Sequence, residues 1–140
     1  MQSLKVKDYM TRRLVTVHPS TNVVEAMDLL LRNGISGLPV VDEGGDLVGV
    51  LSEVDLMQVI VQDSYYDESV GIVRDYMRTE VDTIDPEMDI YTLAEKFVKE
   101  HRRRYPVVEH GRLVGQISRR DVLRASEESL QKTKRRRSIL

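Results

Sequence analysis

The chain has 140 residues, of which 41% are hydrophobic and none is cysteine. This length and composition allow one domain with a packed interior, or two small repeats that share one, and they exclude disulfides, thiol catalysis and cysteine metal sites. The 21 basic and 23 acidic residues leave a net charge of −2, so no bulk field favours nucleic acid or an anionic membrane as a partner.

Targeting and metal signals are also missing from the sequence. No apolar run approaches the roughly 20 residues that a membrane span requires, and residues 1–5 lack the apolar core of a secretory signal. His18, His101 and His110 stand apart, without carboxylates at ligand spacing. We therefore expect a cytoplasmic protein that has no membrane partner and no structural metal site.

The first half of the chain begins with a predicted strand and helix. The strand covers residues 14–17 and ends before Pro19, because proline cannot donate to a sheet ladder. In the helix that follows, Asn22 and Glu25 have the spacing of a capping box, and Gly34 can end it. Its apolar residues lie mostly on one helical face: Val23, Ala26, Met27 and Leu30.

A hairpin and a second helix come next. Residues 38–41 and 47–51 are strand-like and are joined by a glycine-containing turn, which predicts a hairpin. Pro39 and its counterpart Pro106 cannot donate to a ladder, so each marks a sheet edge or a strand start. A second helix is predicted to start at Ser52.

The second half repeats the first. Residues 6–10 return as 73–77, residues 38–41 return as 105–108, and the one change in length falls in the hairpin turn, where the backbone tolerates it. The repeated helix has Asp89 as its predicted N-cap and a regular apolar stripe. That stripe consists of Ile90, Leu93, Ala94, Phe97 and Val98.

The predicted order of elements is therefore β-α-β-β-α, twice, which defines a mixed α/β (α+β) fold class. The repeats cover residues 4–62 and 71–128. A polar, aperiodic linker at residues 63–70 separates them. Residues 129–140 form a basic tail without apolar period, which we expect to be flexible. Two copies are too few for a solenoid and indicate a pseudo-symmetric pair.

Two motifs resemble a known family. Residues 34–42 read Gly-Ile-Ser-Gly-Leu-Pro-Val-Val-Asp, and Gly-x-x-Ser-x-x-Asp closes both repeats at residues 49–55 and 115–121. Together with the repeated β-α-β-β-α order, they resemble a tandem cystathionine-beta-synthase (CBS) domain pair, or Bateman module, over roughly residues 4 to 125.

The resemblance implies a fold and a function. It implies two motifs packed sheet to sheet about a pseudo-two-fold axis, with clefts that bind AMP, ADP, ATP or S-adenosylmethionine and with no required cofactor. Such pairs commonly form homodimers, are not enzymes, and regulate an enzyme, channel or transporter. Because little of this sequence lies outside the pair, a stand-alone module acting on an unidentified regulated protein is expected.

The Ser-x-x-Asp residues have a structural and a functional interpretation. Ser52 and Asp55 can simply cap a helix, since a serine and an aspartate both favour its N-terminal end. In the second copy Arg119 and Arg120 place cations at that positive end, which a cap alone would not favour. An anion there would reverse the argument, so this copy is predicted to hold a phosphate.

By resemblance, Asp55 and Asp121 would accept hydrogen bonds from ribose hydroxyls, while Ser118 and Arg120 would approach phosphate. The helix dipole alone can explain the cations of residues 101–104, but the resemblance places Arg103 and Arg104 at a polyphosphate. Arg119 and His101 are interpreted as ordinary solvated side chains. The residues predicted to line the nucleoside are Thr21, Ala26, Ile35 and Ser36, which also suit a cap, a core position and a turn.

Three functions follow from these patterns. The leading hypothesis is a non-catalytic adenine-nucleotide sensor whose ligand rearranges a homodimer. The second is a dimerisation or protein-interaction scaffold that needs no ligand. The third, which the charge balance disfavours, is salt-sensitive nucleic-acid attachment through residues 132–137. An enzyme is the weakest interpretation, because no nucleophile is supplied with a base.

Overall fold

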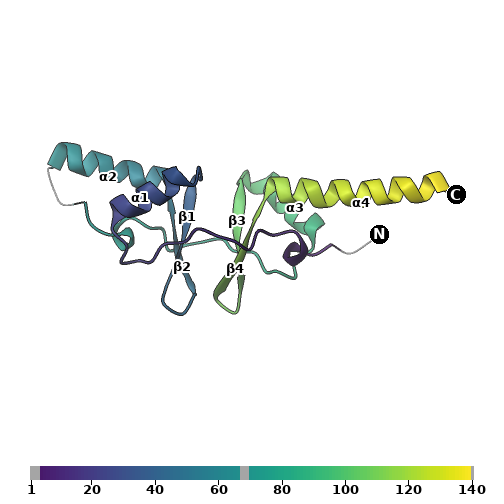
Figure 1. Ribbon diagram of the computed structural model, residues 1–140, viewed down its shortest axis with the longest axis horizontal. Helices are drawn as coiled ribbons and strands as arrows, with labels where there is room; N and C mark the ends of the chain where they lie inside the picture. The colour runs from purple at the N-terminus through teal and green to yellow at the C-terminus, as the bar shows by residue number, and fades with distance from the viewer. Residues whose placement is uncertain (1–3, 67–69, 140) are drawn as a thin grey trace. The chain divides into compact units, whose positions relative to one another are not determined.

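The computed structural model describes residues 4–66 and 70–139 of the chain. Within these ranges it has four α-helices and two two-stranded antiparallel sheets (Figure 1). The elements of the first half are η1 (Val6–Asp8), α1 (Val23–Arg32), β1 (Gly37–Val41), β2 (Leu47–Ser52) and α2 (Glu53–Tyr66). Those of the second half are η2 (Val73–Asp75), α3 (Ile90–Glu100), β3 (Arg104–Glu109), β4 (Arg112–Ser118) and α4 (Arg119–Ile139). The predicted mixed fold class is confirmed.

The chain packs as two compact units whose boundaries cross the sequence repeats. The β1–β2 unit contains residues 15–81 and 110–113, and the β3–β4 unit contains residues 1–14, 82–109 and 114–140. The segment that opens each repeat therefore packs with the hairpin of the other repeat. Sequence similarity defines the repeats, whereas packing defines the units.

The strand predicted before each first helix is reduced to one parallel bridge. In the β1–β2 unit the Val17 amide donates to the Pro39 carbonyl at 3.1 Å, and the Val41 amide donates to the Val17 carbonyl at 2.9 Å. The Ile84 amide donates to Pro106 in the same way, at 2.9 Å. Each proline supplies only an acceptor here, so its missing N–H costs nothing. The prediction of a full strand at residues 14–17, and of its repeat before α3, was wrong.

The predicted helix starts are confirmed. The Asn22 side chain accepts from the Val24 and Glu25 amides, and Asp89 accepts from the amides of Tyr91 and Thr92. These bonds satisfy amides that have no partner inside the helix.

Each unit has its own apolar core, formed by one face of its helices against its hairpin. The most buried side chains of the β1–β2 core include Val23, Ala26, Leu38, Val40, Leu51 and Val73. Those of the β3–β4 core include Val6, Ile90, Leu93, Tyr105, Val107 and Ile117. The predicted stripes therefore supply much of both cores, but Val98 was wrongly included, since it is 74% exposed.

The second helix of each repeat is longer than the sequence suggested. Helix α2 runs to Tyr66, into the predicted linker, of which residues 67–69 lie outside the described residues. Helix α4 runs to Ile139, so the basic segment is helical in the structure (Figure 1). Neither extension carries an apolar period, which is why the pattern did not reveal it.

The glycine of each Gly-x-x-Ser-x-x-Asp motif permits a close backbone approach. A Cβ atom at Gly49 would lie 2.8 Å from the Arg78 carbonyl oxygen and 2.9 Å from the Met77 sulfur. At Gly115 it would lie 2.6 Å from the Met10 sulfur. The residue after Gly49, Val50, exchanges two 2.9 Å backbone hydrogen bonds with Arg78. The glycine thus lets the segment that contains Arg78 lie against β2 and form a bridge with Val50.

We expect Gly49→Ala to destabilise the fold by about 1 to 3 kcal/mol, because the new methyl group overlaps a backbone carbonyl that cannot turn away. Urea unfolding measures the change. Gly44→Ala is the matched control, since its Cβ would only make an ordinary 3.5 Å contact with Asp42. Equal stability of the two variants would contradict the close-approach explanation.

Candidate functional site

Both Ser-x-x-Asp motifs form reciprocal helix caps. The Asp55 Oδ2 atom accepts from the Ser52 amide and hydroxyl, both at 2.8 Å, and the Asp55 amide donates to Ser52 Oγ at 3.3 Å. Asp121 and Ser118 repeat this geometry at 2.8, 3.0 and 3.2 Å. The capping interpretation is therefore correct for both copies, and it explains why a carboxylate is tolerated at this depth.

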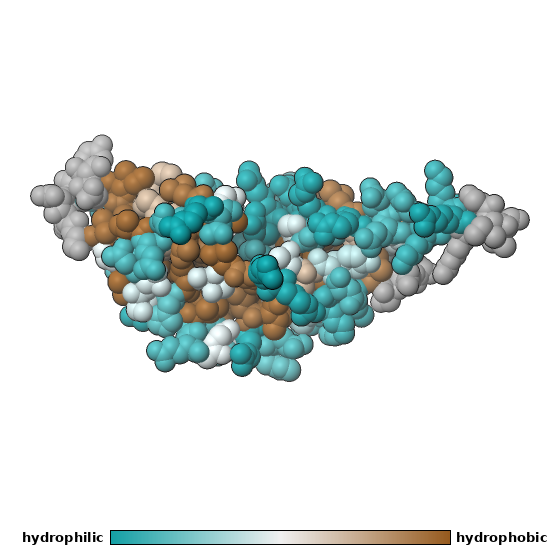
Figure 2. Space-filling model, viewed as in Figure 1, coloured by the Kyte–Doolittle hydropathy of each residue, from teal (hydrophilic) through white to brown (hydrophobic). Residues whose placement is uncertain are grey.

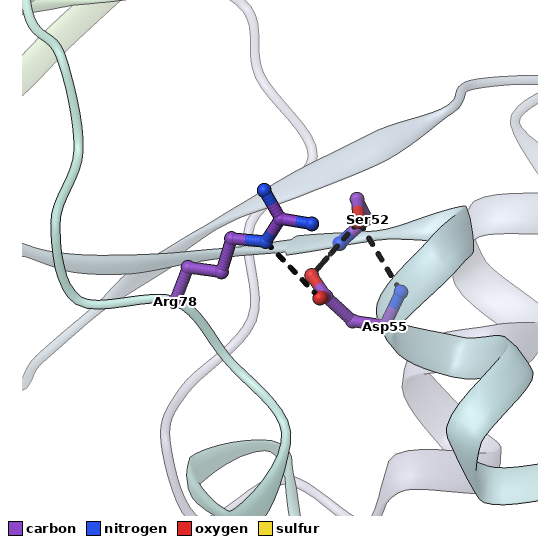
Figure 3. A network of polar contacts seen from close by, with 3 residues as sticks. All are labelled: Ser52, Asp55 and Arg78. Carbon is purple, nitrogen blue, oxygen red and sulfur yellow. Dashed lines mark hydrogen bonds and ion pairs between the residues drawn. The ribbon is translucent and has the colours of Figure 1, made fainter.

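The caps use only one oxygen of each aspartate. Asp55 and Asp121 are 7% and 6% exposed. Their second oxygens, Oδ1, are paired with arginines: Arg78 Nε lies 3.3 Å from Asp55 (Figure 3), and Arg124 Nη2 lies 3.3 Å from Asp121. Each helix start thus has one carboxylate oxygen that the cap holds in place but does not use as an acceptor.

In each unit the start of the second helix is hydrogen-bonded to the segment that precedes the hairpin. In the β3–β4 unit the Arg119 amide donates to the Arg103 carbonyl at 3.1 Å, which places Arg103 and Arg104 beside the Ser118–Asp121 cap. In the β1–β2 unit the Glu53 amide donates to Ser36 at the same distance, which places Ile35 and Ser36 beside Ser52 and Asp55. We call these groupings the β3–β4 half-site and the β1–β2 half-site.

Arg104 is the least satisfied residue of the β3–β4 half-site. Its Nε atom is buried and has no hydrogen-bond partner among the described residues, although the residue as a whole is half-buried. Arg119 and Arg120 are exposed at the start of α4. A buried donor of a charged group without an acceptor is costly, so the position suits an anion.

Two predicted nucleoside-lining residues have structural tasks in the β1–β2 unit. Thr21 Oγ1 accepts from the His18 amide at 3.1 Å, in the turn before α1. Ala26 has 0% exposure and packs in the core. Both positions agree with the structural alternatives read from the sequence, and their contact with a ligand stays a prediction.

Sequence reasoning missed a charged network at the end of α3. Lys96 Nζ lies 2.9 Å from Asp82 and 2.7 Å from Glu100, and the Tyr105 hydroxyl donates to Glu100 at 3.0 Å. Arg102 also approaches Glu100, at 4.0 Å. The four-residue spacing of Lys96 and Glu100 was a visible signal, but Asp82 and Tyr105 are joined to it only by the fold. The network anchors both ends of the 102–104 segment.

The network shifts the pKa of its members. The hydrogen bond from Lys96 lowers the pKa of Glu100 to about 2, from an ordinary 4.5. Burial, followed by the hydrogen bond to Glu100, raises the pKa of Tyr105 to about 12. Lys96 in turn has a raised pKa because of its hydrogen bond to Glu100. All three groups keep their ordinary charge states at neutral pH.

This network predicts a pH dependence. Because the folded-state pKa of Glu100 is depressed, its stabilisation is complete above the ordinary pKa of 4.5 and is lost as the pH falls toward 2. Glu100→Gln should therefore flatten the decrease in Tm across this acidic window, as followed by circular dichroism. Glu95→Gln, on an exposed position of the same helix, should keep the wild-type slope. A wild-type slope in Glu100→Gln would contradict the assignment.

Residues 4–66 and 70–139 hold neither a metal-ligand cluster nor a helix that could span a membrane. No cluster of three or more metal-ligating side chains occurs there. None of the helices in this part of the chain combines the length and the apolar character that a membrane span needs.

Comparison with known proteins identifies the class. The CBS domain family matches residues 6–62 and 73–128, so the chain belongs to the CBS domain family and carries two tandem copies.

Individual relatives agree with this class. The chain is 31% identical over 129 residues to the A-adding tRNA nucleotidyltransferase of Aquifex aeolicus. The matched region covers 92% of this chain but only 15% of that enzyme. It is 33% identical to CBSX2, crystallised in complex with AMP, with a TM-score of 0.77 over 89% of this chain and 96% of that one. The CBS domain pair of protein MJ0100, crystallised with 5′-methylthioadenosine and S-adenosyl-L-methionine, is 26% identical, with a TM-score of 0.73 and coverage of 91% and 99%.

Proposed function

We propose that the chain is a non-catalytic regulatory module that binds an adenosyl ligand such as AMP, ADP, ATP or S-adenosylmethionine. The observation that carries the proposal is the buried Arg104 Nε atom, which has no acceptor within the described residues and adjoins the Ser118–Asp121 cap. An unpaired buried donor costs about 1 to 3 kcal/mol, and more when it is charged. A ligand that supplies an anionic acceptor would recover this cost.

A nucleotide meets the needs of this half-site. Phosphate oxygens are strong acceptors for guanidinium groups, and Arg120 and the start of α4 add positive potential. Asp121 Oδ1 is a carboxylate oxygen with one 3.3 Å arginine partner, and a carboxylate is a suitable acceptor for a ribose diol. We assign Arg103, Arg104, Ser118 and Arg120 to the phosphates, and Asp121 to the ribose.

The nucleoside assignment also draws on relatives. CBSX2 was crystallised with AMP, and the MJ0100 domain pair with 5′-methylthioadenosine and S-adenosyl-L-methionine. These ligands share an adenosyl group and differ in charge, which supports an adenosyl ligand for this chain. By family position, Thr21, Ala26, Ile35 and Ser36 would line a nucleoside, and Ser52 and Asp55 would contact a ligand in the β1–β2 half-site.

Replacing Arg104 tests whether its buried Nε atom serves a bound phosphate. Arg104→Met should weaken AMP binding at least tenfold in isothermal titration calorimetry, because a charge-assisted phosphate contact is lost. The Tm without ligand should stay constant or rise, since the variant removes an unsatisfied buried donor. A residue with only a structural task would give the opposite pattern.

Arg119→Met is the matched control for Arg104→Met. Arg119 is exposed and is interpreted as a solvated side chain, so its loss should leave AMP affinity within a factor of two or three. If Arg104→Met binds AMP like the wild type, the phosphate assignment is wrong. If the wild-type protein gives no heat and no Tm shift with AMP, ADP, ATP or S-adenosylmethionine, the adenosyl proposal fails for these ligands.

We further propose that the module acts as a homodimer. On α2 several exposed residues are apolar, with Val54 63%, Met57 55% and Val61 48% exposed. On α4 Leu123 and Leu130 are 68% and 67% exposed. Figure 2 shows apolar surface over the α2 end, whereas most of the length of α4 is hydrophilic. A second copy of the chain would cover these residues, and exposed apolar clusters of this kind mark interaction surfaces.

Met57→Glu should therefore convert the dimer to a monomer in size-exclusion chromatography with light scattering, because a charge would be buried without a partner. Gln58→Glu places the same charge on the flank of the same helix and should leave the dimer intact. A wild-type monomer at high micromolar concentration, or an intact Met57→Glu dimer, would contradict this surface.

The same apolar surface favours the second candidate function, a scaffold that dimerises without a ligand. The two functions differ in one measurable respect. A sensor should gain several degrees of Tm with saturating ligand by mass action, whereas a scaffold should keep its dimer and its Tm unchanged.

A further inference from the structure

The aspartate oxygen that the cap does not use, Oδ1, is paired with an arginine from a different place in each half-site. Asp55 Oδ1 is paired with Arg78, which comes from the extended segment after η2 and is distant in sequence (Figure 3). Asp121 Oδ1 is paired with Arg124, one turn further along its own helix. A ligand diol that approaches Asp55 therefore meets a guanidinium from a different element.

The fold holds the Arg78 backbone in place. Its amide and carbonyl form the two 2.9 Å hydrogen bonds with Val50, two residues before Ser52. Gly49 makes this approach possible, since any Cβ there would meet the Arg78 carbonyl at 2.8 Å. Only the side chain is free to move, and it is 65% exposed while the Asp55 side chain is 8% exposed.

The other unit has the same frame with a different residue. Thr11 exchanges backbone hydrogen bonds of 2.8 and 2.9 Å with Gln116, as Arg78 does with Val50. A threonine has no charge to pair with Asp121. The guanidinium at Asp55 is thus an addition to a shared frame and is not required by it.

Stability does not explain the Arg78 contact well. The Ser52–Asp55 cap is complete through Oδ2 and needs no arginine. An ion pair with a largely exposed partner contributes little to the stability of the fold. The side chain can therefore leave Asp55 at low cost, provided that it finds another anion.

We propose that Arg78 is a specificity residue of the β1–β2 half-site: it covers Asp55 Oδ1 when the site is empty and turns to an anionic group of the ligand when a ribose diol takes its place. This inference rests on the proposed adenosyl function. An uncharged nucleoside must displace Arg78 without compensation, whereas a nucleoside phosphate returns an acceptor to the guanidinium. The half-site should accordingly prefer nucleoside phosphates.

The test compares AMP with adenosine in the full chain, by amide NMR titration. The Ser52 and Asp55 amides report on the β1–β2 half-site, and the Ser118 and Asp121 amides report on the other. In Arg78→Thr, which copies the residue at Thr11, adenosine should bind more tightly and AMP more weakly at Ser52 and Asp55. The AMP-to-adenosine affinity ratio should fall about tenfold there, the low end expected for a hydrogen bond to a charged group.

Two further variants separate position from charge. Arg78→Lys keeps the cation and should retain most of the preference for AMP. Arg74→Thr removes the same charge from an exposed residue of η2 and should leave the ratio unchanged. The ratio at Ser118 and Asp121 should not change in any of the three variants.

Each alternative result is decisive. An unchanged ratio in Arg78→Thr, or an equal fall in Arg74→Thr, would overturn the role of Arg78 while leaving the proposed function intact. A response to AMP at Ser118 and Asp121 but not at Ser52 and Asp55 would have the same meaning. If wild-type amides respond to neither ligand in either half-site, the adenosyl proposal itself fails for these ligands, and this inference fails with it.

Discussion

The reciprocal bond between a serine and a buried aspartate at the start of α2 and of α4 is the interaction on which the rest of the structure depends. It ends a hairpin strand and begins a helix within one residue. It also keeps a carboxylate at 6% to 7% exposure by giving one of its oxygens two donors. Because the cap does not use the other oxygen, Oδ1, the cap and the proposed ligand contact do not compete for the same atom. The same aspartate can therefore form both.

The repeated frame carries different chemistry in its two copies. In the first copy Leu29 of α1 and Leu38 of β1 are apolar. Their counterparts in the second copy are Lys96 and Tyr105, which belong to the charged network with Glu100. This network leaves Arg104 next to the α4 cap with an unsatisfied donor. The copies therefore offer one half-site with an unsatisfied arginine donor and one in which the Arg78 guanidinium is paired with Asp55.

The predictions from sequence were best where a single residue type suffices. Asn22 and Asp89 were identified as caps from their spacing alone, and the structure confirms them. The predictions failed where the backbone is held by a distant segment: the expected strand at residues 14–17 is one bridge to β1. They also missed Arg78, since nothing in the local pattern of that segment relates it to Asp55, 23 residues away.

The sequence by itself determined the repeat, the family, the α-β-β-α order within each copy and the helix starts, because these follow from local spacing and from residues that act within one turn of chain. Only the tertiary structure decided how the opening segment of each repeat is exchanged between the two units, and that Arg78 meets Asp55, 23 residues away. The Arg78–Asp55 pair depends on the close backbone approach at Gly49. Glycine in a sequence permits that approach without naming the segment that makes it.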